Sequence, residues 1–218
     1  MGKLSASILS ADLGNLADQV KLLERHADVI HVDVMDAHFV PPLTIGPVVV
    51  ASLRPHTDRT LHGHLMVDAP AELFDDLAEA GTDVVSFHVE AVDDPGPVIA
   101  KARGAGMRVG LTVNPETPIE TVFPHLDEID DVMVMSVHPG SAGPTFLPEA
   151  LPKLEGVRRE LERRGLSADL EVDGGVNLDN AKRCVDAGAT VLVAASAIFQ
   201  ADDVEAAARD LKAIVEAA

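Results

Sequence analysis

Short hydrophobic runs recur along the whole chain at regular intervals. Each is five to seven residues long, which is a typical length for a β-strand buried in a sheet. The runs occupy residues 5–9, 28–34, 61–67, 83–89, 107–113, 131–137, 168–174 and 190–196. The pattern therefore predicts eight strands.

Most of the stretches between these runs have the pattern of helices. Residues 71–81, AELFDDLAEAG, end in a glycine that suits the end of a helix. Several other units likewise end in an alanine–glycine pair just before the next strand. Residues 95–106, 148–165, 177–188 and 202–218 also have the pattern of helices. Strands that alternate with helices predict a parallel sheet.

The number and spacing of these units predict the fold class. Eight strand–helix units in 218 residues match the size of an α/β fold of the (β/α)₈ TIM barrel type. We expect a single barrel domain over residues 1–218. A doubly wound open sheet is the alternative, but eight evenly spaced units favour a closed barrel.

Composition narrows the classes of partner. The chain has 36 acidic and 17 basic residues and a net charge of −19, which argues against binding nucleic acid. Two explanations of the acid excess stay open, a salt-rich cytoplasm and an ordinary acidic surface. No apolar run approaches 18 residues, and the first 14 residues lack the pattern of a signal peptide, so we expect no membrane partner.

Cys184 is the single cysteine, so the chain cannot form an internal disulfide. This usage fits a reducing compartment. We therefore expect a cytoplasmic location.

The stretch HVDVMDAHFV, residues 31–40, carries an unusual set of side chains. Val32 and Val34 alternate with His31, Asp33 and Met35, as in a strand with two distinct faces. In TIM barrels the active site lies at the C-terminal ends of the strands. Polar residues that point inward there are candidates for chemistry.

Two further polar residues fall at predicted strand ends, His64 in the third strand and Asp173 in the seventh. With His31 and Asp33 they form a set of two imidazoles and two carboxylates that can converge on one divalent cation. Such ligands suit Zn²⁺, Fe²⁺, Mn²⁺ or Co²⁺ without choosing among them. Each residue alone is explained as a buried hydrogen-bonded group, but their joint placement favours a metal site. His88 and Glu90 also end a strand, and a structural or a functional role stays open for both.

Loops of small residues follow three of the strands. Gly174 and Gly175 follow the seventh strand, Ser196 opens a short helix after the eighth, and HPGSAG, residues 138–143, follows the sixth. Loops after strands seven and eight are where this fold commonly binds phosphate, through backbone N–H groups at a helix N-terminus. Such locally aimed groups can hold an anion despite the negative net charge.

Taken together, several motifs resemble the ribulose-phosphate 3-epimerase family. They are SILSADLGNL, HVDVMDAHFVPPLTIGP, HLMV, VGLTVNPETP, VMVMSVHPG and EVDGGVN, and they extend in order from about Ser7 to Phe199. The resemblance implies a barrel of the ribulose-phosphate-binding type. It also implies an isomerase of the pentose phosphate pathway that interconverts D-ribulose 5-phosphate and D-xylulose 5-phosphate.

The resemblance assigns roles to individual positions. It implies one divalent metal ion per chain, with ligands His31, Asp33, His64 and Asp173. Asp33 and Asp173 match the paired acid and base. The positions that match contacts to the substrate are Ser7, His64, Gly140, Ser141, Ala142, Gly143, Gly174, Gly175, Ala195 and Ser196. We expect Met35, Met66 and Met135 to line the intermediate, and we expect a homo-oligomer.

The chain departs from the family pattern in its loops. MDAHFVPP stands where the family has MDGHFVPN, so Ala37 replaces glycine and Pro42 replaces asparagine. HPGSAGP, residues 138–144, stands where the family has NPGFGGQ, and Ala195 replaces glycine. With a positive φ at residue 195, alanine would narrow the phosphate site. We therefore expect weaker phosphate contacts and a raised KM.

Three other functions are compatible with the same fold. The first is an epimerase for another ketose phosphate. The second is an aldolase or decarboxylase, which would use a lysine at a strand end, where none of the six lysines is predicted to lie. The third is a non-catalytic barrel that binds a metal or a sugar phosphate, but a binding protein has no need of two opposed carboxylates.

Overall fold

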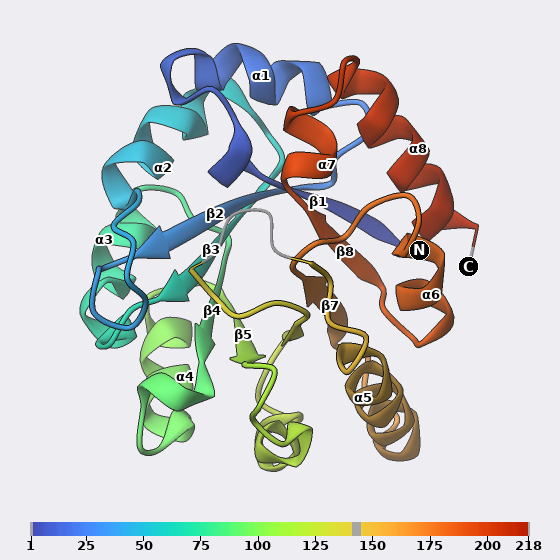
Figure 1. Cartoon of the computed structure of the whole chain (residues 1–218). Helices are drawn as coiled ribbons and strands as arrows, with labels where there is room; N and C mark the ends of the chain where they lie inside the picture. The colour runs from blue at the N-terminus through green and yellow to red at the C-terminus, as the bar shows by residue number, and fades with distance from the viewer. Residues whose placement is uncertain (1, 141–144, 218) are drawn as a thin grey trace.

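The computed structural model describes residues 2–140 and 145–217 and contains a closed barrel of eight parallel strands (Figure 1). Neighbouring strands pair in chain order, and β8 pairs with β1 to close the barrel. The strands are β1 Lys3–Ser7, β2 Val29–Met35, β3 Thr60–Met66, β4 Val84–His88, β5 Arg108–Val113, β6 Asp131–Met135, β7 Asp169–Asp173 and β8 Val191–Ala194. The predicted fold class is confirmed.

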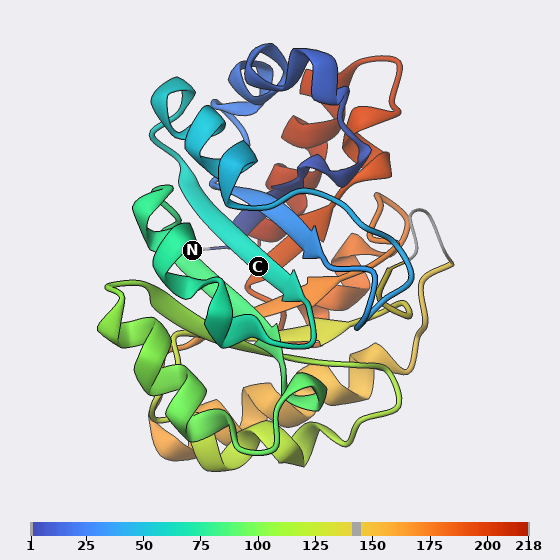
Figure 2. The same ribbon diagram turned by 90° about the vertical axis from the view of Figure 1, so that its left-hand side faces the viewer.

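Helices surround the barrel on its outer side (Figures 1 and 2). They are α1 Leu16–Leu23, α2 Pro47–Leu53, α3 Phe74–Glu79, α4 Pro95–Gly104, α5 Ala150–Arg164, α6 Ala181–Asp186, α7 Ser196–Phe199 and α8 Val204–Glu216. Among the residues described, no helix combines the length and the apolar character needed to cross a bilayer.

The first strand differs from the predicted run of residues 5–9. The first strand ends at Ser7, because Ile8–Ser10 turns into a 3-10 helix whose first free N–H, on Leu9, is accepted by the Ser7 hydroxyl. Between β5 and β6, a stretch for which no helix was predicted, the chain forms the 3-10 helix Ile119–His125. Pro124 lies inside this segment and has no N–H to donate, which disfavours a regular α-helix there.

The strands bury their two faces in different surroundings. One face of each strand packs its apolar side chains against the helices in a single large cluster, which includes Val32, Leu65 and Val134. The other face points into the barrel, where many buried residues are polar: Ser5, Ser7, His31, Asp33, His62, His64, Ser86, His88, Thr112, Asp131 and Glu171. A barrel interior is usually filled by branched apolar side chains. This interior is polar along much of its length.

Strand register brings the polar residues of neighbouring strands side by side. In the β2–β3 pair, His31 lies opposite His62, Asp33 opposite His64, and Met35 opposite Met66. In the β6–β7 pair, Met135 lies opposite Asp173. The C-terminal mouth of the barrel therefore receives carboxylates, an imidazole and thioethers at the same level.

The alanine–glycine pairs before the strands adopt the backbone that only glycine accepts easily. Gly81 has a φ of 91° and Gly188 a φ of 110°. A Cβ atom at either position would also collide with an arginine side chain, that of Arg54 or of Arg158. These glycines let each helix end tightly and return the chain to the barrel.

Ala37 is the only described residue other than glycine with a positive φ, at 61°. It follows β2 in a loop where its N–H donates to the carbonyl of Pro42, 3.0 Å away. This left-handed backbone costs an L-residue about 1–2 kcal/mol. Replacement by glycine removes that cost, although glycine loses more entropy on folding.

We therefore expect Ala37→Gly to raise the free energy of unfolding by roughly 0.5–1 kcal/mol. Urea unfolding followed by circular dichroism measures the change. Ala78→Gly, inside α3, is the matched control and should lower the stability by about 1 kcal/mol. An Ala37→Gly protein that is less stable than the wild type would contradict the strain assigned to this loop.

Candidate active site and metal centre

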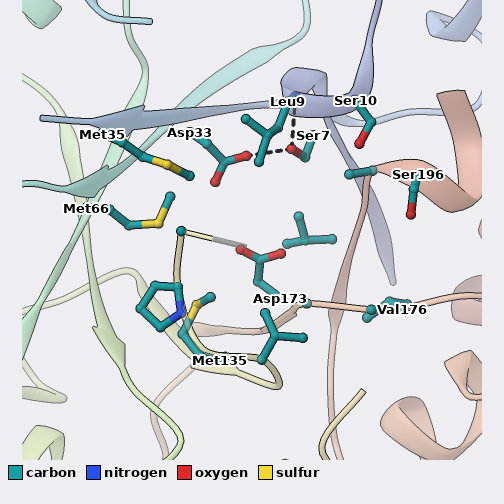
Figure 3. A pocket seen from close by; sticks show the side chains of 17 residues that line it. Ser7, Leu9, Ser10, Asp33, Met35, Met66, Met135, Asp173, Val176 and Ser196 are labelled. Carbon is teal, nitrogen blue, oxygen red and sulfur yellow. Dashed lines mark hydrogen bonds between the residues drawn. The ribbon is translucent and has the colours of Figure 1, made fainter. Parts of the chain in front are cut away.

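A pocket opens at the C-terminal mouth of the barrel (Figure 3). Its lining comes from β1, β2, β3, β6, β7 and β8 and from the loops that follow several of them. The lining residues are Ser7, Leu9, Ser10, Asp33, Met35, Met66, Met135, Val137, Pro139, Gly140, Asp173, Gly174, Gly175, Val176, Val193, Ala195 and Ser196. Most of the residues predicted to contact substrate are therefore gathered in one place.

Asp33 and Asp173 approach each other across the floor of this pocket, from β2 and from β7 (Figure 3). Beneath them lie His31 and His64, which are fully buried and do not line the pocket. One donor atom from each of the four residues lies within 4.8 Å of the others. The predicted set is therefore brought together. The predicted substrate contact of His64 stays a prediction.

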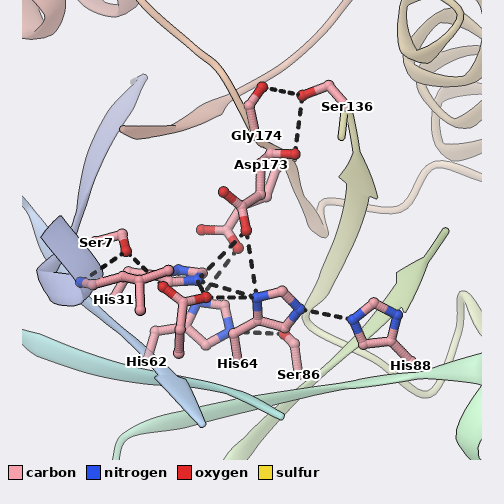
Figure 4. Close-up of polar contacts among 12 residues, drawn as sticks. Ser7, His31, His62, His64, Ser86, His88, Ser136, Asp173 and Gly174 are labelled. Atoms are coloured by element: carbon pink, nitrogen blue, oxygen red, sulfur yellow. Dashed lines mark hydrogen bonds and ion pairs between the residues drawn. The ribbon is translucent and has the colours of Figure 1, made fainter. Parts of the chain in front are cut away.

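The distances within this cluster are those of hydrogen bonds and ion pairs (Figure 4). Nδ1 of His64 lies 3.1 Å from Oδ1 of Asp33 and 3.4 Å from Oδ2 of Asp173. Nε2 of His31 lies 3.3 Å from Oδ1 of Asp33 and 3.8 Å from Oδ2 of Asp173. Nε2 of His31 and Nδ1 of His64 are 3.3 Å apart. All four groups thus direct a polar atom at one point.

These separations fit a bound divalent cation. Four ligands placed about 2.0–2.1 Å from a tetrahedral metal ion lie about 3.3–3.4 Å from one another. The measured separations of 3.1 to 3.8 Å bracket that value. Two carboxylates also balance the two positive charges of the cation, while neutral imidazoles add no charge. The donor set therefore could hold Zn²⁺, Fe²⁺, Mn²⁺ or Co²⁺.

Burial and the neighbouring charges act in opposite directions on the pKa values of the cluster. Burial alone would lower the pKa of His64, but hydrogen bonds to Asp173 and Asp33 outweigh burial and raise the pKa to about 9. Burial likewise opposes a charge on His31, yet the attraction of Asp33 raises its pKa. Burial would raise the pKa of Asp33, but His31 and His64 hold that pKa well below its usual range.

Two serines fix the carboxylate-bearing strand ends. The Ser7 hydroxyl donates to Oδ2 of Asp33 at 2.6 Å, which leaves Oδ1 facing the histidines. The Oγ atom of Ser136 lies 2.9 Å from the carbonyl oxygen of Asp173 and 2.7 Å from that of Gly174. The Ser136 N–H also donates to the Asp173 carbonyl, at 2.7 Å. These contacts hold the position from which the Asp173 side chain extends.

The loop after β7 needs its glycines. Gly174 has a φ of 118° and Gly175 a φ of 63°. A Cβ atom on Gly174 would collide with the side chain of Val137. The chain can therefore turn sharply beside the pocket and leave backbone groups exposed to a ligand.

The loop after β8 meets the β7 loop beside the pocket. Ser196 begins α7, as predicted, and residues of both loops line a neighbouring hollow. Ala195 has a φ of −114°, so alanine introduces no left-handed strain there. The positive φ on which the predicted narrowing of the phosphate site depended is therefore not found. Gly140 lines the pocket. The predicted loop residues Ser141, Ala142 and Gly143 lie outside the described residues.

Three methionines form an apolar wall of the pocket. Met35 and Met66 belong to one buried cluster and Met135 to another, and each has at most 4% of its surface exposed. Their thioethers lie beside the carboxylates (Figure 3). This placement matches the predicted lining of the reacting centre, although the role itself stays a prediction.

A second buried polar layer, which sequence reasoning missed, lies below the site. Nε2 of His62 is 2.7 Å from the hydroxyl of Ser86, which lies 3.2 Å from Oδ2 of Asp131. Nδ1 of His62 is 3.4 Å from Oε2 of Glu171. Burial and repulsion from Glu171 raise the pKa of Asp131 well above its ordinary value. The alternation of His62 with His64 in LHGHLMV was the available signal.

Comparison with known proteins gives a consistent result. A sequence model described as the ribulose-phosphate 3 epimerase family matches residues 3–199. The chain is 44% identical to the ribulose-phosphate 3-epimerase of Mycobacterium bovis over 209 residues, which cover 96% of this chain and 91% of that protein. It is 42% identical to the ribulose-phosphate 3-epimerase of Schizosaccharomyces pombe over 207 residues, which cover 93% of this chain and 89% of that protein.

A solved structure supports the fold independently. The 3-hexulose-6-phosphate synthase of Salmonella typhimurium superposes with a TM-score of 0.73 over 99% of this chain and 99% of that one. The two sequences are only 21% identical. At this identity the likeness concerns the barrel architecture alone.

The raised pKa of His64 predicts a pH dependence of the metal-free protein. Between about pH 6.5 and pH 9, the folded chain keeps a proton on His64 that the unfolded chain has lost. The stabilisation of the folded state by this proton is complete below about pH 6.5 and disappears as the pH rises through 9. We expect this single group to lower the free energy of unfolding by up to about 1.4 kcal/mol per pH unit in that window.

Urea unfolding of chelator-treated protein at a series of pH values measures this slope. His64→Gln is the control and should lack the His64 part of the decrease. Equal slopes for the wild type and His64→Gln between pH 6.5 and pH 9 would show that His64 is neutral there.

Proposed function

The chain belongs to the ribulose-phosphate 3-epimerase family, and from this premise we propose that it interconverts D-ribulose 5-phosphate and D-xylulose 5-phosphate. The reaction inverts the configuration at C3, next to the ketone. One observation carries the proposal: two carboxylates from distant strands meet across one pocket, above two buried histidines. This arrangement suits the removal and return of a proton.

Inversion of a carbon next to a carbonyl group needs two proton-transfer groups. One must take the proton from one face of the substrate, and the other must deliver a proton to the opposite face. Asp33 extends from β2 and Asp173 from β7, so they approach the pocket from different sides. In one direction Asp33 is the base and Asp173 the acid, and in the other direction the roles exchange. The intermediate is an ene-diolate.

The carboxylates are prepared for these roles by their neighbours. The Ser7 hydroxyl engages one oxygen of Asp33 at 2.6 Å and so orients the carboxylate. The methionine wall of Met35, Met66 and Met135 excludes water from the reacting carbon, which strengthens electrostatic interactions and protects a reactive intermediate. Ser136 holds the end of β7 and with it the backbone of Asp173.

His31, Asp33, His64 and Asp173 would together hold one divalent cation per chain. Such a cation supplies Lewis-acid stabilisation of the negative charge that develops on the substrate oxygens. The separations between the four donor atoms support this assignment. Zn²⁺, Fe²⁺, Mn²⁺ and Co²⁺ all remain compatible with the ligand types.

The remaining parts of the proposal concern the substrate tail and the cellular setting. Backbone groups of Gly174, Gly175, Ala195 and Ser196 would bind the phosphate, at the loops after β7 and β8 where barrels of this type commonly do so. We propose that residues 1–218 act as one domain in a homo-oligomer. We also propose a cytoplasmic location and a place in the pentose phosphate pathway.

An epimerase for another ketose phosphate is the second candidate. Two departures from the family motif lie near the pocket: His138 precedes Pro139, which lines it, and Pro42 lies beside the lining residue Gly140. Such changes affect recognition of the substrate without changing the acid–base pair. A panel of ketose phosphates assayed for epimerisation separates the two candidates.

The reaction is tested with D-ribulose 5-phosphate in D₂O. The proposal predicts that the product carries deuterium at C3, and that Asp33→Asn and Asp173→Asn each reduce turnover by at least about 10². Each variant should retain exchange on the epimer that faces its surviving carboxylate. Because both residues are also proposed ligands, the metal content of every variant is measured alongside.

Asp131→Asn is the matched control for these substitutions. It also places an amide in the barrel interior, but at the N-terminal end of β6, away from the pocket. Its turnover should stay close to that of the wild type. An Asp33→Asn or Asp173→Asn protein with normal metal content and near-normal turnover would remove that residue from the mechanism.

The metal assignment is tested by elemental analysis of protein purified without chelator. We expect one divalent ion per chain and a loss of most of it in His64→Ala. His62→Ala is the control, because His62 faces the same interior one layer lower and is not among the four proposed ligands. Stoichiometric metal in a protein that lacks both His31 and His64 would contradict the assignment.

A further inference from the structure

The second ring nitrogen of His64 is engaged by another histidine. Nε2 of His64 lies 2.9 Å from Nε2 of His88, which ends β4, and both side chains are fully buried. Two ring nitrogens at this distance form a hydrogen bond in which one must donate and the other accept. The direction of this bond determines which nitrogen of His64 is free to bind a cation.

The surroundings of His64 define that direction. Its Nδ1 faces Asp33 and Asp173, so this nitrogen must offer a lone pair if the cluster is to bind a cation. We therefore assign the proton to Nε2, from which it is donated to His88. His88 must then carry its own proton on Nδ1. That nitrogen faces Oε2 of Glu90, at 3.4 Å, a separation longer than that of a strong hydrogen bond.

Glu90 is held in place as the final acceptor. Its other oxygen, Oε1, accepts the N–H of Asn114 at 2.8 Å. Burial would raise the pKa of Glu90, but the neighbouring His88 and Thr117 side chains and the N–H of Asn114 lower it, so the group stays ionised and can only accept. Lys153 donates to the carbonyl oxygen of Asn114 at 2.9 Å and thereby fixes the loop that holds the carboxylate.

We propose that His88 and Glu90 are positioning residues of the metal centre, which act through His64. Glu90 selects the tautomer of His88, and His88 selects the tautomer and ring orientation of His64, so that Nδ1 is presented to the cation. The inference rests on the proposed function, since it assumes that the cluster of His31, Asp33, His64 and Asp173 binds a cation. Neither positioning residue lines the pocket.

Outer-shell partners of this kind commonly change metal affinity by about 10- to 100-fold. His88→Phe keeps a ring of similar size but removes the acceptor, so it should weaken metal binding by about that factor. His88→Gln restores an acceptor through its side-chain carbonyl and should recover most of the affinity. Glu90→Ala removes the final acceptor and should also weaken binding.

The experiment measures the affinity of the full-length protein for Co²⁺ by competition with a chelator, together with the visible spectrum of the Co²⁺ protein. Phe87→Leu is the control for lost packing, because Phe87 neighbours His88 on β4 but packs in the apolar cluster outside the barrel. The proposal predicts weaker binding and an altered spectrum in His88→Phe, with both recovered in His88→Gln and neither changed in Phe87→Leu.

Three results would overturn the proposal while the metal centre stands. They are unchanged affinity and spectrum in His88→Phe, an equal loss in His88→Gln and His88→Phe, and an equal loss in Phe87→Leu. Wild-type protein that binds no Co²⁺, or His64→Ala that binds it normally, would instead contradict the metal centre of the proposed function. The two failures are therefore distinguishable.

Discussion

Four polar side chains that direct their donor atoms at one point inside a closed barrel set the main constraint on this structure. Burying two carboxylates and two imidazoles is costly unless their charges and hydrogen bonds are compensated. Burial opposes positive charge on His31 and His64, but Asp33 and Asp173 outweigh it and raise the pKa of both rings. A divalent cation would supply the same compensating positive charge. Such compensation explains why the donor atoms can lie 3.1 to 3.8 Å apart.

The barrel accommodates this cluster because its interior is polar well below the pocket. Beneath His31, the pair of His62 and Glu171 continues the polar column toward the N-terminal mouth. Gly110 leaves the space that the side chains of Ser86 and Asp131 occupy, since a Cβ atom there would collide with both. The apolar faces of the strands meanwhile pack against the helices, where burial of hydrophobic surface stabilises the fold. The apolar side chains that stabilise the fold and the polar side chains of the candidate site thus lie on opposite faces of the same strands.

The sequence alone predicted the barrel and the clustering of His31, Asp33, His64 and Asp173, because the strands and their polar ends are visible in the local periodicity. The alternation in HVDVMD places His31 and Asp33 on one face of the strand, whichever strands pair with it. The network of Ser86, Asp131 and Glu171 was not predicted, since it depends on register between strands that are far apart in the chain. At Ala195 the expected strain depended on a φ angle that the residue type does not determine.

If His31, Asp33, His64 and Asp173 form one cation site, anomalous X-ray diffraction will locate the ion among them. Crystals of protein purified without chelator are measured on both sides of the absorption edge of the metal found by elemental analysis. We expect one anomalous peak per chain, about 2.0–2.2 Å from His31 Nε2, Asp33 Oδ1, His64 Nδ1 and Asp173 Oδ2. A peak bound by other residues, or none at these four in a catalytically active crystal, would show that these side chains do not form the cation site.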